Sequence, residues 1–136
     1  MMRAAWIAIV AAAAVSLFVA GCGGSDDAAT ETVVIRFSRF GPETMTVRAG
    51  APVNFTLRND DPIEHEWIIG TEDVHARHRT GTEPYHDAIP TEVTIPSLST
   101  KTTIVTFDAP GDYIYVCHLP GHEAYGMRGV LRVVES

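Results

Sequence analysis

The sequence has only two cysteines, Cys22 and Cys117, and it is poor in basic residues. Its 136 residues include 10 Lys and Arg against 17 Asp and Glu, which gives a formal net charge of −7. A chain with so little positive charge is an unlikely partner for nucleic acid, whereas a partner protein with a basic surface would be attracted to it. No His-x-His pair occurs, and residues 32–136 have no convincing helical period of useful length.

The N-terminus resembles the signal segment of bacterial lipoproteins. Arg3 precedes an apolar run, Ala4 to Ala20, that is too short and too rich in alanine for a comfortable membrane span. The tetrapeptide Val19-Ala20-Gly21-Cys22 resembles a lipobox, in which the chain is cut before a lipid-carrying cysteine. The resemblance implies a signal peptide over 1–21 and an anchor at Cys22, on the outer face of the cell membrane or in the periplasm. An ordinary signal peptide or an uncleaved anchor is the alternative.

Residues 22–31 are small, polar and acidic, with nothing to bury, and therefore predict a flexible tether. The folded part is then expected over 32–136, about 105 residues, which is enough for one domain with one core. If Cys22 carries a lipid, Cys117 is left as the only thiol in an oxidising compartment and has no internal partner. Such a thiol is either buried as a small apolar group or used as a metal ligand.

Short runs rich in β-branched and aromatic residues fill the chain from residue 32 onward. Segments such as NDDP and DAPGD separate them as turns, so we predict an all-β Greek-key sandwich or barrel of about seven to eight strands. The predicted strands are 32–40, 45–49, 52–59, 65–70, 92–96, 102–108, 112–117 and 128–135.

The segment VCHLPGHEAYGM, residues 116–127, collects soft ligands between two predicted strands. Four residues separate Cys117 from His122, and four more separate His122 from Met127. Because the intervening proline and glycines allow turns, the three side chains can face one point. A thiolate, imidazoles and a weak thioether suit a blue-copper site, provided that a second imidazole arrives from elsewhere.

His65 is the best candidate for that imidazole, since it follows a turn and begins a predicted apolar strand. His118 is nearer in sequence to Cys117, but adjacent residues of a strand point to opposite faces. We therefore expect His118 to face away from the metal.

The ordered set His65, Cys117, His122 and Met127 in a β-rich chain resembles the cupredoxins, small type 1 copper proteins such as azurin and plastocyanin. The resemblance covers residues 32–135. It implies one type 1 copper ion, with the two histidines and the cysteine in the trigonal plane and Met127 as the axial ligand. It also implies an electron port at His122, flanked by Leu119, Pro120, Ala124 and Tyr125, although an apolar loop can equally serve packing alone.

Two features depart from the best-known members. Glu66 stands where azurin and plastocyanin have an asparagine, which puts the hydrogen bonds to the Cys117 sulfur in doubt. The segment 71–91 is long and polar, with His75, His78 and His86. These histidines are expected to belong to a solvated loop with at most one short turn, and an accessory metal site is the open alternative.

The implied function is the carriage of single electrons between redox partner proteins outside the cytoplasmic membrane. The alternative is an extracytoplasmic copper carrier, buffer or resistance protein with the same ligands. The loop also resembles that of multicopper oxidases, but Val116 replaces one histidine of their bridge to a trinuclear copper cluster. We therefore expect no enzyme, and a monomer whose partners present basic docking faces.

Overall fold

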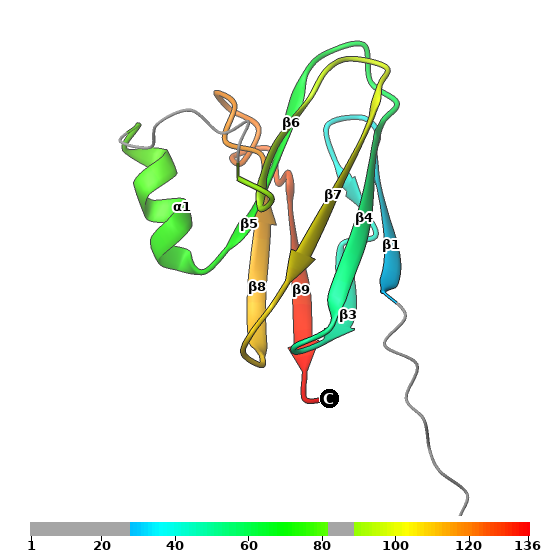
Figure 1. The fold of residues 1–136 in the computed structure, drawn as a ribbon. Helices are drawn as coiled ribbons and strands as arrows, with labels where there is room; N and C mark the ends of the chain where they lie inside the picture. The colour runs from blue at the N-terminus through cyan, green and yellow to red at the C-terminus, as the bar shows by residue number, and fades with distance from the viewer. Residues whose placement is uncertain (1–27, 82–88) are drawn as a thin grey trace, which may run out of the picture.

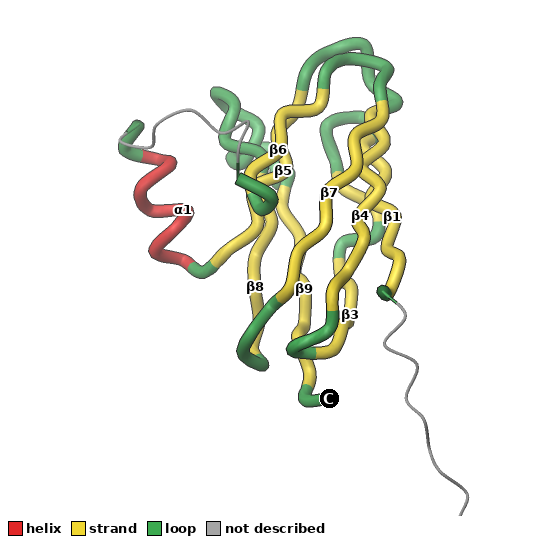
Figure 2. Tube along the Cα trace, in the orientation of Figure 1, coloured by secondary structure: helices red, strands yellow, loops and turns green. Residues whose placement is uncertain are grey.

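The computed structural model describes residues 28–81 and 89–136. They form two packed β-sheets with one short helix at the side (Figures 1 and 2). The predicted signal peptide, Cys22, most of the predicted tether and His86 lie outside these residues. No helix among the described residues has both the length and the hydropathy required to cross a membrane.

Nine strands are present in the described part of the chain. In chain order they are β1 (Ala29–Ile35), β2 (Phe40–Gly41), β3 (Thr44–Arg48), β4 (Pro52–Asn59), β5 (His65–Gly70), β6 (Glu92–Ile95), β7 (Thr100–Thr106), β8 (Gly111–Val116) and β9 (Arg128–Val134). One sheet has the order β2-β1-β4-β7 and the other β3-β9-β8-β5-β6. Strand β1 pairs in parallel with β4, and β3 with β9; the other pairs are antiparallel. The predicted all-β sandwich is confirmed.

Alternation along β4 shows why these residues form a sandwich. Val53, Phe55 and Leu57 are fully buried, whereas Asn54 is half-buried and Arg58 is exposed. This period of two places one face of the strand in the core. Each large apolar side chain buried in this way contributes about 1.5–3 kcal/mol.

Aromatic side chains join the two sheets beneath the predicted site. Phe55 of β4 contacts Trp67 of β5, with ring centroids 4.9 Å apart, and the Trp67 ring lies 6.4 Å from that of Tyr115. The Tyr115 hydroxyl donates to the carbonyl of Pro42. Gly129 of β9 leaves room for this ring, because a Cβ atom there would lie 2.2 Å from Tyr115 Cζ. Strands β5 and β8 thus enter the predicted site from a close-packed core.

The strand predicted over 32–40 is interrupted. Phe37 and Ser38 have φ angles of 55° and 52°, so the chain turns there and divides the run into β1 and β2. Strand β1 also begins at Ala29, inside the predicted tether, where it pairs with Val53 of β4. The sheet therefore includes residues that have no apolar pattern to predict a strand.

The polar segment after β5 contains a helix, α1 (Glu72–Arg79), where the sequence predicted a loop with at most a short turn. Acidic residues occupy its first turn and basic residues its last, which complements the helix dipole. Its buried residue is His75 rather than an aliphatic side chain. The expectation of a solvated loop was therefore wrong for this stretch, because the apolar periodicity that reveals a helix is missing.

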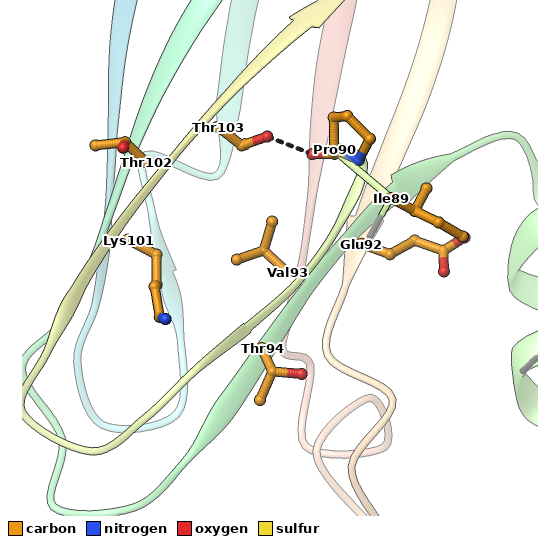
Figure 3. Close-up of a pocket in the computed structure, with 8 residues that line it drawn as sticks. All are labelled: Ile89, Pro90, Glu92, Val93, Thr94, Lys101, Thr102 and Thr103. Atoms are coloured by element: carbon orange, nitrogen blue, oxygen red, sulfur yellow. Dashed lines mark hydrogen bonds between the residues drawn. The ribbon is translucent and has the colours of Figure 1, made fainter. Parts of the chain in front are cut away.

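A surface hollow of about 470 Å³ lies between β6 and β7 (Figure 3). A hydrogen bond from Thr103 Oγ1 to the Pro90 carbonyl crosses it. Its lining is Ile89, Pro90, Glu92, Val93, Thr94, Lys101, Thr102 and Thr103. None of the predicted copper ligands lines this hollow, so it is separate from the predicted metal site.

Candidate metal centre

Three of the four predicted ligands meet at one end of the sandwich. His65 begins β5, Cys117 follows the last residue of β8, and His122 lies in the loop from β8 to β9 (Figure 1). His65 Nδ1 and Cys117 Sγ each lie 3.2 Å from His122 Nδ1, and all three donor atoms lie within 4.8 Å of one another. Two donors bound to one metal ion at ~2.0–2.3 Å are themselves about 3–4 Å apart. The cluster therefore has the dimensions of a metal site.

His65 is fully buried and presents a defined nitrogen to the cluster. Its Nε2 lies 3.0 Å from Asp61 Oδ2, so the Nε2–H donates to the carboxylate and the Nδ1 lone pair faces the other ligands. Burial lowers the pKa of His65, although Asp61 opposes that shift. The imidazole is thus neutral near pH 7, which is the state that a metal ligand requires.

Asp61 is a functional residue that the sequence analysis missed. Burial opposes its ionisation, but the backbone amides of Ser38 and Phe37, together with His65, outweigh burial and hold the pKa of Asp61 below its ordinary value. The only sequence signal is an acidic residue four positions before a candidate ligand. Carboxylates paired with metal-bound histidines commonly orient the ring.

Cys117 is fully buried beside the two histidines. The backbone N–H of Glu66 donates to its sulfur at 3.3 Å. The presence of Glu66 in place of asparagine had put a hydrogen bond to this sulfur in doubt. The main chain makes that bond, so it needs no particular side chain at position 66. Burial raises the pKa of the Cys117 thiol to about 11, against the opposing effect of the Glu66 and Leu119 amides.

Met127 adjoins the cluster through its main chain. Its carbonyl accepts a hydrogen bond from the Cys117 amide at 3.2 Å, and its own amide donates to the His122 carbonyl at 3.0 Å. Gly121 and Gly126, with φ angles of 86° and 88°, provide the turns between these residues. The Met127 side chain is fully buried. Its role as axial ligand stays a prediction.

His118 lies with the histidines of α1. Its Nε2 is 2.9 Å from His75 Nδ1, and its ring stacks on that of His78 with centroids 5.2 Å apart. His75 Nε2 donates to the Ile114 carbonyl, and His78 Nδ1 to that of Val74. Within residues 28–81 and 89–136, however, the only group that brings three donor atoms within 4.8 Å is His65, Cys117 and His122. An accessory metal site at His75 and His78 stays an open prediction, because His86 lies outside the described residues.

An ionic clamp ties α1 to the loop that carries His122. Arg79, the last residue of the helix, donates to both carboxylate oxygens of Glu123, with Nη2 2.6 Å from Oε1. Arg79 Nη1 also contacts Glu72. The pKa of Arg79 is raised and that of Glu123 is lowered, chiefly by this contact. The helix therefore braces the loop directly beside a predicted ligand.

The surface beside His122 is partly apolar. His122 is half-buried, Pro120 and Ala124 are exposed, and Tyr125 is 75% exposed. Leu119 is half-buried and packs against the core. The loop thus presents a small apolar rim around the half-exposed imidazole, as expected of a contact surface.

The donor set suits a soft or borderline metal ion such as copper. One thiolate sulfur and two imidazole nitrogens are donors of the kind found in copper sites, whereas carboxylate-rich sites suit Mg²⁺ and Ca²⁺. His65 and Cys117 are fully buried, and hydrogen bonds with Asp61 and from the Glu66 amide hold their donor atoms in place.

Comparisons with known proteins identify the family of this chain. The family model described as a cupredoxin-like domain matches residues 6–133. The chain is 33% identical over 94 residues to the copper-resistant cuproprotein CopI of Rubrivivax gelatinosus, which covers 67% of this chain and 57% of that protein. It is 30% identical over 133 residues to auracyanin-B of Chloroflexus aurantiacus, and the match covers 82% of this chain and 57% of that protein. The chain therefore spans little more than half the length of these two relatives.

Solved structures give the same fold. Reduced auracyanin from Roseiflexus castenholzii is 24% identical, with a TM-score of 0.67 over 79% of this chain and 98% of that one. Auracyanin A, a "blue" copper protein from Chloroflexus aurantiacus, is 25% identical, with a TM-score of 0.61 over 77% and 98%. The likeness confirms the sandwich topology that presents the cluster.

Proposed function

Because this chain belongs to the cupredoxin-like family, we propose that it holds one type 1 copper ion and carries single electrons between partner proteins. His65, Cys117 and His122 would hold the ion together with the weaker donor Met127. The observation that carries the proposal is the convergence of a buried thiol and two imidazoles within 4.8 Å. Copper, when bound, supplies the one-electron couple of Cu(I) and Cu(II).

The chain's own residues favour electron transfer over chemistry on a substrate. His65 is held by Asp61, the Cys117 sulfur by the Glu66 amide, and the His122 loop by Arg79. Donors held by such contacts change position little between oxidation states, which lowers the reorganisation that each transfer requires. The half-buried His122 ring, next to exposed Tyr125, is the proposed port. We propose no enzymatic activity.

A copper-handling role is the second candidate. It is favoured by the 33% identity to a protein named as copper-resistant. A carrier must release its metal, whereas this site is buried and braced. Stopped-flow measurement of electron self-exchange, together with copper transfer to a metal-free acceptor chelate, separates the two roles. Slow self-exchange with ready copper transfer would favour the carrier.

The central experiment is the absorption and EPR spectrum of the copper-loaded protein. We expect an intense blue or green colour, because a cysteine sulfur bound to Cu(II) gives a strong visible transition in cupredoxins. Cys117→Ser should abolish the colour and keep the β-sheet circular dichroism. The matched control is the other cysteine: Cys22→Ser should keep the colour. A colourless wild-type protein would count against the type 1 site.

We also propose that the protein acts outside the cytoplasmic membrane, anchored by a lipid on Cys22 after removal of residues 1–21. The lipobox-like Val19-Ala20-Gly21-Cys22 supports this. Fractionation of cells that express wild type and Cys22→Ala tests the anchor, since the variant should leave the membrane fraction. Retention of the variant in the membrane would favour an uncleaved anchor. The partners are proposed to present basic faces to this acidic monomer, so association should weaken with salt.

A further inference from the structure

Several hydrogen bonds fix the Asp61 carboxylate in addition to its contact with His65. The amides of Phe37 and Ser38 each donate to it at 2.7 Å, one to Oδ1 and one to Oδ2. The Asp61 amide donates to Asn59 Oδ1, and the Asp61 carbonyl accepts from the Leu98 amide. Only 7% of the residue is exposed. The carboxylate therefore cannot rotate away without breaking several hydrogen bonds.

Three residues with unusual backbone conformations donate hydrogen bonds to Asp61, and two of them, Phe37 and Ser38, form the tight turn between β1 and β2. Phe37 and Ser38 adopt positive φ angles that side chains disfavour, and both amides point at Asp61. Leu98, whose amide donates to the Asp61 carbonyl, also has a positive φ, of 52°. Loops from β1 to β2 and from β6 to β7 thus converge on this one residue. Such strain is retained where the surrounding structure requires it.

From this geometry we propose that Asp61 is a positioning residue for the copper ligand His65 and lowers the reduction potential of the site. The proposal rests on the proposed copper function. The hydrogen bond fixes the tautomer with Nε2–H toward Asp61 and leaves the Nδ1 lone pair for the metal. A negative charge behind the ring also makes the imidazole a stronger donor, which stabilises Cu(II) more than Cu(I).

Asp60 offers a matched control one residue away. Its carboxylate pairs with Arg36 at 2.9 Å and with Arg58 at 3.0 Å, and its side chain is 24% exposed. The described contacts of Asp60 do not include His65. Asp60→Asn and Asp61→Asn therefore remove the same charge from the same loop, but only the second changes the hydrogen bond to a ligand.

The first test is competition titration of both copper states, with cyclic voltammetry. Asp61→Asn should weaken Cu(II) binding about 10-fold to 100-fold, the usual effect of losing a group that orients a ligand. Cu(I) binding should weaken less, and a tenfold difference between the two corresponds to a potential raised by about 59 mV. Asp60→Asn should leave both affinities within about twofold of wild type. Equal potentials for wild type and Asp61→Asn, or equal shifts in the two variants, would overturn the proposal.

The second test needs no variant and no copper. ¹⁵N NMR of the metal-free wild-type protein should show His65 protonated at Nε2 and unprotonated at Nδ1 at pH 8. The opposite tautomer would overturn the proposal even if Asp61→Asn fails to fold. A wild-type protein without a type 1 spectrum would refute the copper function instead, so the two failures are distinguishable.

Discussion

Copper binding should release one proton from Cys117. Burial raises the pKa of this thiol to about 11, so the copper-free protein holds it protonated at pH 8, whereas a metal binds the thiolate. Ionising the thiol costs about 1.4 kcal/mol for each pH unit below its pKa, so at pH 8 copper binding loses about 4 kcal/mol to this step. The apparent affinity should therefore rise about tenfold per pH unit between pH 8 and pH 10. His65 adds no proton there, because its pKa is lowered and the ring is already neutral.

Isothermal titration calorimetry measures this directly. Cu(I), delivered without oxygen from a chelate of known proton stoichiometry, should give heats that depend on the ionisation enthalpy of the buffer with a slope of one proton. Cys117→Ser should lose that dependence, since its hydroxyl does not ionise in this range. A wild-type slope near zero at pH 8 would show that the thiol is already ionised and would refute the assignment of a desolvated, neutral Cys117.

Three further outcomes are expected. Met127→Leu should keep copper and raise the reduction potential, because a weak donor to Cu(II) is lost, and an unchanged voltammogram would mean that Met127 is not axial. Gly129→Ala should lower the free energy of unfolding in urea by about 3 kcal/mol, since its Cβ would overlap Tyr115. Gly41→Ala, with no atom nearer than 3.8 Å, is the control, and similar losses in both would refute the packing argument. The copper-free protein should lose stability from about pH 6.5 toward pH 4, because burial lowers the pKa of His118 to about 4 and only the unfolded chain takes up that proton. His118→Gln should flatten this slope in urea titrations at stepped pH, and an unchanged slope would assign it to other groups.

The strands could be predicted because their burial follows local alternation. The alternation of Val53, Phe55 and Leu57 predicts the buried face of β4, and the fold buries these three side chains. The candidate ligands in the loop could also be predicted from the sequence, since the spacing of Cys117 and His122 is a local property. His65 required only the rule that a ligand at a strand end can meet a loop at the same end of a sandwich.

The role of Asp61 and the presence of α1 could not be predicted from local sequence in the same way. The role of Asp61 depends on the turn after β4 and on amides from the β1–β2 loop, which are distant in sequence. Helix α1 buries His75 against the Ile114 carbonyl instead of an apolar stripe, so no periodicity marks it. Likewise, nothing local indicated that Phe37 would leave the strand, because neither Phe37 nor Ser38 is a residue type typical of the two-residue hairpin turn that they form.

The clamp between Arg79 and Glu123 bears on protein engineering. Loops that carry metal ligands are attractive modules for transplantation between β-sandwiches. In this protein, residues 118–126 would arrive in a new host without the cation that holds Glu123, and with His118 cut off from His75. A faithful transplant therefore has to include α1 as well, so the transferable unit is discontinuous in sequence: one helix and one loop, 44 residues apart at the clamp itself.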